Sequence, residues 1–336
     1  MTYAHIAAEL LAEEELPGHG DRSSWYDAFL VRDRSCWLVA EDAAGTVAAR
    51  VAADPSRILA ERRRGPSAPA GETRGFVSPL KDGGLAVVGE GRVTVYDDAA
   101  RARWSHAFEP WSDRGNASAS CVDDASGRRL LVTTPGPDAG DGAYAGDLCV
   151  ALDLADGRRV AHAVLPSATA GYAFQQSLTD PAQLLLNALQ GDTFYGLEVS
   201  LRDDVLHVAE FGLENDPFAG VSLNGAVIKA DVGGGWLSRW EEGRDDVVVE
   251  AEDVLPDDLC FAGHHAGFLD KDRVLSAVAA EPESTDTRHL VLDGHTLLPL
   301  AELTYPGTSC ADPLALGDGT WLTVEGDVIR RWRSAG

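Results

Sequence analysis

Residues 76–97 read FVSPLKDGGLAVVGEGRVTVYD, and this stretch decides the fold. It holds a short strand that ends at Leu80, a tight Asp-Gly-Gly turn, an almost wholly apolar strand, a second glycine-rich turn, and a strand that ends in Asp97. Apolar segments separated by Asp/Gly turns predict antiparallel strands joined by hairpins. The stretch therefore predicts one meander of antiparallel strands.

The same pattern occurs seven times along the 336 residues, counting this copy. Each copy has an apolar anchor residue directly before a polar turn; the anchors are Val31, Leu80, Val122, Leu178, Leu223, Leu269 and Leu316. They lie 42 to 56 residues apart, close to the period of a four-stranded propeller blade. The longest interval contains a glycine-rich insertion at 136–146, which we expect to be a loop between two strands.

The strands within each copy differ in their polarity. The second strands are nearly continuous apolar runs, as at 37–40, 130–132, 184–186 and 321–324. Such runs are typical of strands covered on both faces, whereas the more alternating third strands, as at 148–153 and 289–293, are typical of partly exposed positions. The chain is therefore predicted to be all-β, a seven-bladed β-propeller of four-stranded antiparallel blades.

Residues 22 to 334 resemble the WD40/YVTN-like β-propeller superfamily, whose repeats combine an apolar strand, an Asp-Gly turn and a strand ending in Asp. The Trp-Asp dipeptide of true WD40 repeats is missing from this sequence. The resemblance therefore implies the propeller shape only, and no side-chain network or activity follows from it.

The last repeat ends near Trp332 without a fourth strand, so another segment must cover that edge. We expect residues 1–20 to pack on or close the propeller formed by residues 21–336. Ile6, Ala7, Leu10 and Leu11 at helical spacing favour a short N-terminal helix, with a closing strand as the alternative.

Charge and cysteine usage limit the classes of partner. A formal net charge of −26 repels phosphate backbones and anionic lipids, which argues against nucleic acid and membrane partners. The five cysteines form no close pair, and the N-terminal sequence lacks the features of a secretory signal, so we expect reduced thiols and a cytoplasmic protein. We expect a monomer without a cofactor.

Ligands of propellers commonly lie at the mouth of the central channel, where the innermost strands begin. The candidate ligand-binding residues at these positions combine aromatic rings with hydrogen-bonding groups, which is typical of a small-molecule pocket; they are Trp25, Tyr26, Arg74, Asn116, Tyr172, Phe174, Gln175 and Phe218.

His264 and His265 are the candidates for acid–base catalysis, because a histidine titrates near neutrality. Adjacent strand residues point to opposite faces, so at most one of them faces the channel, with Asp312 or Asp27 as an orienting carboxylate. A structural histidine bonded to a neighbouring blade is the alternative. The scattered histidines predict no metal site, and we expect Asp138, Asp141 and Asp147 of the insertion to lie in a solvated loop because they lack calcium-loop spacing.

Two functions follow from these features. The first is a module that binds a small molecule or a protein partner through the channel mouth and the blade loops. The alternative is an enzyme of specialised metabolism, a lyase, cyclase or hydrolase with acid–base residues at the channel mouth.

Overall fold

Short backbone hydrogen bonds close the turn that follows each anchor residue. In three of the repeats the anchor amide donates to the carbonyl oxygen four residues later: Leu80 to Gly84 at 2.9 Å, Leu269 to Arg273 at 2.9 Å, and Leu316 to Thr320 at 3.0 Å. The side chains of these three anchors are buried. The repeated pattern therefore encodes a tight turn with an apolar residue held at its base.

The aspartate at the end of the third strand caps the next turn. The Asp97 side chain accepts hydrogen bonds from the amides of Ala99 at 3.0 Å and Arg101 at 2.8 Å. Asp293 caps its turn in the same way. These hydrogen bonds, with the Arg101 amide first, hold the pKa of Asp97 below its ordinary value.

A computed structural model describes residues 3–15, 27–30, 36–42, 45–64, 76–89, 91–111, 117–124, 126–137, 144–176, 183–191, 193–211, 217–222, 224–282, 284, 286–307, 313–325 and 328–335. The chain divides into two compact units. Unit 1 comprises residues 1–43, 49–62 and 217–336, and unit 2 comprises residues 44–48 and 63–216.

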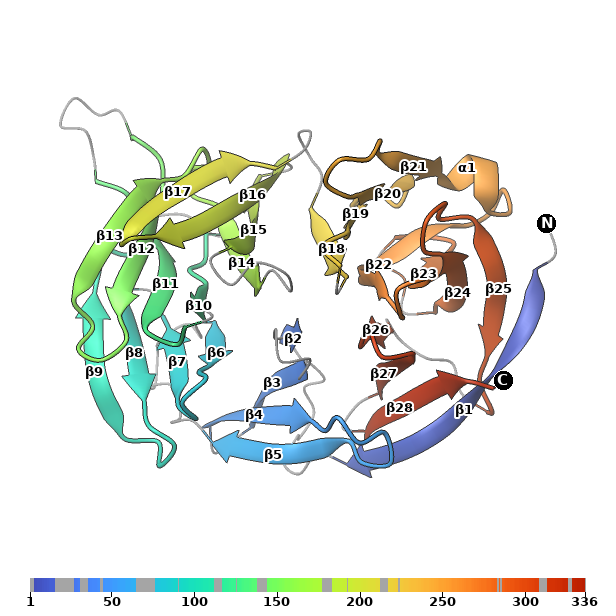
Figure 1. The fold of residues 1–336 in the computed structure, drawn as a ribbon, viewed down its shortest axis with the longest axis horizontal. Helices are drawn as coiled ribbons and strands as arrows, with labels where there is room; N and C mark the ends of the chain where they lie inside the picture. Colours follow the sequence, from blue (N-terminus) through green and yellow to red (C-terminus); the bar gives the residue numbers. More distant parts are fainter. Residues whose placement is uncertain are drawn as a thin grey trace. The chain divides into compact units, whose positions relative to one another are not determined.

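Unit 2 contains three antiparallel sheets of four consecutive strands each (Figure 1). The first sheet is β6 (Val77–Pro79), β7 (Leu85–Val88), β8 (Arg92–Tyr96) and β9 (Ala102–Ala107). The second is β10 (Cys121–Asp123), β11 (Arg129–Thr134), β12 (Leu148–Asp153) and β13 (Arg159–Val164). The third is β14 (Gly171–Gln176), β15 (Gln183–Gln190), β16 (Thr193–Arg202) and β17 (Val205–Glu210).

Unit 1 holds most of the remaining strands. One four-stranded sheet is β2 (Asp27–Leu30), β3 (Cys36–Asp42), β4 (Gly45–Val51) and β5 (Leu59–Arg64), of which residues 45–48 and 63–64 are assigned to unit 2. Another is β18 (Phe218–Val221), β19 (Val227–Ala230), β20 (Trp236–Trp240) and β21 (Val247–Glu250). A short helix, α1 (Ala251–Val254), follows β21.

The last two sheets of unit 1 share one strand. They are β22 (Cys260–Phe268), β23 (Arg273–Ala279), β24 (Arg288–Asp293) and β25 (Pro299–Thr304), then β26 (Leu314–Ala315), β27 (Thr320–Glu325), β28 (Val328–Ser334) and β1 (Ala4–Glu15). Together they form an eight-stranded sheet in the order β22-β23-β24-β25-β1-β28-β27-β26. If these eight strands are counted as two groups of four, the described strands form seven four-stranded sheets. This confirms the prediction of seven four-stranded antiparallel sheets.

Strand β1 closes the last sheet. Residues 8–15 pair antiparallel with β28, and residues 4–7 pair parallel with β25. The closing-strand alternative is thus confirmed, and the helix favoured by the spacing of Ile6, Ala7, Leu10 and Leu11 is wrong. The unpaired amides and carbonyls of the β28 edge favour a strand, because a helix would leave that edge open.

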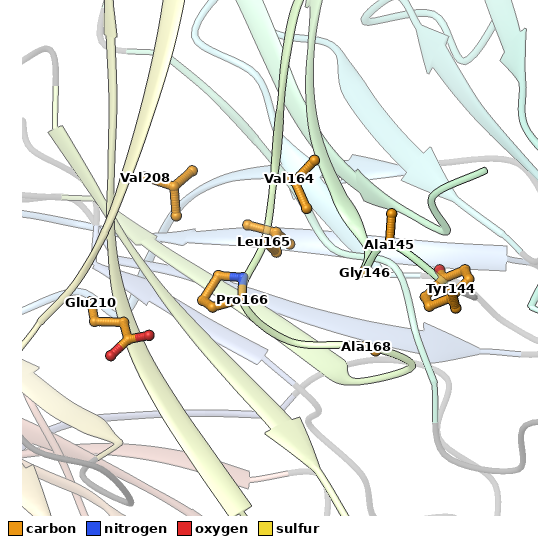
Figure 2. Close-up of a pocket in the computed structure, with 9 residues that line it drawn as sticks. All are labelled: Tyr144, Ala145, Gly146, Val164, Leu165, Pro166, Ala168, Val208 and Glu210. Atoms are coloured by element: carbon orange, nitrogen blue, oxygen red, sulfur yellow. The ribbon is translucent and has the colours of Figure 1, made fainter. Parts of the chain in front are cut away.

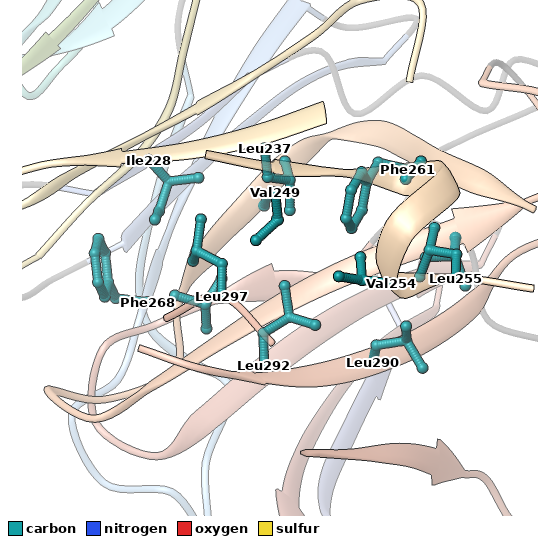
Figure 3. Packing of buried hydrophobic residues seen from close by; sticks show 14 of the residues in the cluster. Ile228, Leu237, Val249, Val254, Leu255, Phe261, Phe268, Leu290, Leu292 and Leu297 are labelled. Carbon is teal, nitrogen blue, oxygen red and sulfur yellow. The ribbon is translucent and has the colours of Figure 1, made fainter. Parts of the chain in front are cut away.

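Apolar side chains fill the space between neighbouring sheets within each unit. In unit 1, residues from the β18–β21 sheet and the β22–β25 sheet form one cluster, in which Ile228, Leu237 and Leu292 are almost fully buried (Figure 3). In unit 2, Leu131, Leu186 and other apolar residues fill the space between the second and third sheets. The inner strands are therefore covered on both faces, as their apolar sequences predicted. Among the described residues, no helix has the length and apolar character needed to cross a membrane.

Arg331 of β28 is a buried cation that joins two sheets of unit 1. Its side chain is 1% exposed and donates to the Ala52 carbonyl oxygen at 2.6 Å, to Thr320 Oγ1 at 3.1 Å and to Asp318 Oδ2 at 2.6 Å. Arg333, two residues later, is half-exposed and pairs with Glu9 of β1. The two arginines therefore differ in burial and in partners.

Replacing Arg331 by Ala is expected to lower the free energy of unfolding by about 2–3 kcal/mol, because the buried Ala52 carbonyl loses its donor. Arg333→Ala is the matched control and should change it little, since exposed ion pairs contribute little. Urea unfolding followed by tryptophan fluorescence measures both. Equal effects of the two substitutions would contradict the structural role given to Arg331.

Asp123 at the end of β10 is a buried carboxyl, 4% exposed. Burial raises its pKa to about 6, although a hydrogen bond from the Lys81 amide at 2.9 Å opposes this. Because the folded state holds the proton more tightly than the unfolded chain, this group stabilises the fold below about pH 4. That stability is lost as the pH rises to about 6.

The Asp123→Asn variant should therefore gain stability relative to the wild type as the pH rises from 4 to 7, by on the order of 2 kcal/mol. Urea unfolding of both proteins at intervals across this range gives the difference. A difference that does not vary with pH would show that Asp123 does not titrate in this window.

Candidate functional site

A polar cluster in unit 2 surrounds Asp147, directly before β12. Its carboxylate is fully buried and accepts from Trp111 Nε1 at 3.0 Å, from Tyr172 OH at 2.7 Å, from the Ala170 amide at 3.2 Å and from Tyr144 OH. We call these five residues the Asp147 hub. Their segments follow β9, precede β12 and lead into β14, so the hub joins segments attached to all three sheets of unit 2.

The backbone around the hub is held as closely as its side chains. The Asp147 amide donates to the Ser167 carbonyl at 3.0 Å, and the Leu165 amide donates to the Asp147 carbonyl at 2.8 Å. Tyr144 OH accepts a hydrogen bond from the Gly136 amide at 2.8 Å. The hub therefore fixes both described ends of the insertion and the connection between β13 and β14.

Glycine is required where these segments meet. A Cβ at Gly136 would lie 2.0 Å from the carbonyl oxygen of Gly146, a distance that no side chain tolerates. Gly146 itself has a φ of 103° and lies against the Leu165 carbonyl oxygen. The close approach of three backbone segments explains these two glycines.

A solvent-open pocket of about 650 Å³ lies beside the hub. Figure 2 shows Val208 and Glu210 of β17 at one end, Tyr144 and Gly146 at the other, and Val164, Leu165 and Pro166 between them. The remaining lining residues are Ala145 and Ala168. The pocket thus has an apolar centre, an acidic end, and walls that the hub holds in place.

The hub itself is not suited to proton transfer from Tyr172. Burial, reinforced by the negative charge of Asp147, raises the pKa of the Tyr172 hydroxyl far above its ordinary value. This hydroxyl donates to Asp147 at 2.7 Å and accepts from Ser167 Oγ at 2.8 Å. The arrangement favours a structural role that positions the pocket walls.

Five of the twelve site residues predicted from the sequence lie outside the described residues. These are Trp25, Tyr26, Arg74, Asn116 and Asp312. For Asp27 in β2 and for His264 and His265 in β22 the backbone is described and the side chains are not. Their catalytic and ligand-binding roles stay predictions.

Four predicted ligand-binding residues can be placed. Tyr172 and Phe174 are buried between the second and third sheets of unit 2, and the Tyr172 hydroxyl belongs to the hub. Gln175 is half-buried in β14, and Phe218 is buried in β18 of unit 1. The positions of these four residues do not test their predicted role in ligand binding, which stays a prediction.

The solvated loop expected for the acidic insertion is wrong at Asp147. This carboxylate is fully buried because four donors converge on it, a coincidence that the linear sequence does not display. Asp138 and Asp141 lie outside the described residues. Trp111, Tyr144 and Glu210 also escaped prediction, although a Tyr and an Asp flanking a glycine-rich insertion are a signal that points to an anchored loop.

Cys36 and Cys149 are unsuited to nucleophilic catalysis. Burial raises the pKa of the Cys36 and Cys149 thiols to about 12, so both are protonated near neutrality. Cys36, Cys121 and Cys149 are buried, as expected, and Cys260 is partly exposed. In the described part of the chain, no group of three or more His, Cys, Asp or Glu residues is arranged to hold a metal ion.

The seven sheets and their connections define a β-propeller. No protein-family model matches the sequence, and no curated protein matches it. Solved structures of similar fold include streptogramin B lyase, with a TM-score of 0.58, 10% identity, and coverage of 96% of this chain and 98% of that one.

Two further propellers are similar over nearly their whole length. The Cps50 (Swd1) β-propeller domain of Myceliophteria thermophila has a TM-score of 0.54 and 11% identity, covering 92% of this chain and 96% of that one. BamB from Moraxella catarrhalis has a TM-score of 0.50 and 14% identity, covering 97% and 99%. At these identities the likeness establishes the fold alone, and it confirms the resemblance to propellers seen in the sequence.

Replacing Asp147 by Ala is expected to lower the free energy of unfolding by about 3–5 kcal/mol, because several buried donors lose their acceptor together. Tyr172→Phe removes one donor and should cost about 1 kcal/mol. Urea unfolding measures both variants. A cost for Asp147→Ala no larger than that for Tyr172→Phe would contradict the role of Asp147 as the common acceptor.

Proposed function

We propose that this protein is a cytoplasmic binding module whose partner occupies the pocket between β13 and β17 of unit 2. The observation that supports the proposal is the pocket itself, an open cavity of about 650 Å³ beside a buried hub. Its volume falls in the range of ligand-binding clefts. The cytoplasmic location rests on the N-terminal sequence and the cysteine usage alone.

Rigid support for an exposed surface favours binding. In the Asp147 hub, the buried carboxylate accepts four hydrogen bonds. These bonds hold residues 144–147 and 165–170 in one arrangement. Surfaces held in this way lose little entropy when a partner binds. Val164 contributes an apolar side chain that is 53% exposed on this surface.

An enzyme is the alternative function. The similarity in fold to a streptogramin B lyase supports it only at the level of architecture, because one fold hosts many activities. The acid–base candidates for such an enzyme, His264 and His265 with Asp312 or Asp27, have no described side-chain geometry. The pocket in unit 2 therefore supports binding more directly than catalysis.

A photo-crosslinking amino acid at position 164 is expected to give a discrete covalent adduct in the cells that produce the protein. The same amino acid at position 248 is the matched control, because Val248 is 55% exposed, belongs to unit 1 and is not among the residues that line the pocket. Denaturing electrophoresis with mass spectrometry identifies the adducts. Identical adduct patterns at the two positions, or none at position 164, would overturn the proposal.

A further inference from the structure

Four positions on the pocket wall have no free hydrogen-bond donor. Pro166 has no amide proton. The Leu165 amide donates to the Asp147 carbonyl, and the Ala168 amide donates to Gln190 Oε1 at 2.8 Å. The Tyr144 hydroxyl donates to the Asp147 carboxylate. These four wall positions therefore cannot donate a hydrogen bond to an acceptor group of a ligand.

Glu210 supplies the opposite kind of group. Its side chain is exposed at one end of the pocket, and within the described part of the chain its carboxylate has no hydrogen bond or ion pair. A carboxylate accepts hydrogen bonds only. Together with a net charge of −26, this carboxylate favours a cationic donor over a neutral or anionic group.

Glu210 lies at the exposed end of β17. Leu206 and Val208 precede it at alternate positions of the strand and pack on the core between the sheets. The core position after them is taken by Phe211, which is buried and whose amide donates to the Gly196 carbonyl at 2.8 Å, as the Leu165 amide donates to the Asp147 carbonyl in the preceding sheet. The Glu210 carboxylate is therefore left at the surface, beside the pocket.

The shape of the pocket narrows the choice of cation. Between the acidic end and Tyr144 the wall presents the exposed side chains of Val164 and Pro166, so a ligand crosses apolar surface before it reaches the carboxylate (Figure 2). An arginine side chain fits this sequence of contacts, because its aliphatic stem packs on apolar groups. Its flat guanidinium then donates two parallel hydrogen bonds to a carboxylate.

We propose that the pocket binds an arginine side chain carried by an extended segment of a partner protein, with the guanidinium paired to Glu210. This inference rests on the proposed binding function and assigns the chemistry of the partner. Tyr144 at the far end would contact the flanking residues of the segment, since the pocket volume of about 650 Å³ exceeds that of a single side chain.

The test uses three small probes with similar chains: n-butylguanidinium, pentanoate and pentanamide. Each is titrated into the full-length protein carrying labelled Val and Leu methyl groups, and methyl NMR shifts are followed. n-Butylguanidinium should shift Val164, Leu165 and Val208 saturably and leave Val205 and Val248 unchanged. Glu210→Gln should weaken this binding at least fivefold, whereas Glu109→Gln, which removes the same charge from an exposed position outside the pocket, should not.

The outcomes separate this inference from the proposed function. Binding of pentanoate or pentanamide as tight as that of n-butylguanidinium, or unchanged binding in Glu210→Gln, would overturn the arginine assignment. If no probe shifts the pocket methyls while position 164 still yields its crosslinked adduct, the arginine assignment fails and the binding function stands. Absence of both signals rejects both.

Discussion

The need to cover both faces of every four-stranded sheet is the constraint on which this structure depends. Inner strands such as β7, β11 and β23 carry apolar side chains on both faces, and neither face can remain in water without a large loss of free energy. Within each unit, neighbouring sheets supply the cover, as the cluster around Ile228, Leu237 and Leu292 shows. Tight turns and Asp caps then follow, because sheets stacked face to face need short connections along their edges.

Sheets that stack in this way still have edges, and the final sheet shows how an edge is covered. Strand β1 supplies the fourth strand of that sheet although it is separated from β28 by more than 300 residues in sequence. Its contribution is mainly backbone pairing, because Ala8 is the buried apolar side chain of the strand and Leu10 is 42% exposed. Arg331 adds a second link in unit 1, from β28 to the carbonyl of Ala52.

Two carboxylates in opposite electrostatic environments belong to the hub and to the pocket beside it. Asp147 is a carboxylate whose charge is compensated by four donors inside the protein, so it fixes geometry and offers nothing to a ligand. Glu210 is an exposed carboxylate at one end of the pocket, and its capacity to accept hydrogen bonds is directed at solvent. Rigid walls and one uncompensated charge are the two properties that a selective binding surface requires.

The sequence by itself determined the repeat, the all-β class and the seven four-stranded sheets, because apolar strands and Asp-Gly turns are encoded by residues close together in the chain. It also indicated buried thiols, which burial of Cys36, Cys121 and Cys149 bears out. For the N-terminal segment, the spacing of its apolar residues favoured a helix. The segment forms a strand instead because it pairs with the free edge of β28. The Asp147 hub and the pocket were likewise decided by tertiary structure, because their members come from positions 111 to 210 and meet only when three sheets pack together. Local patterns specify strands and turns, whereas a site built across several sheets depends on distances that no short stretch of sequence contains.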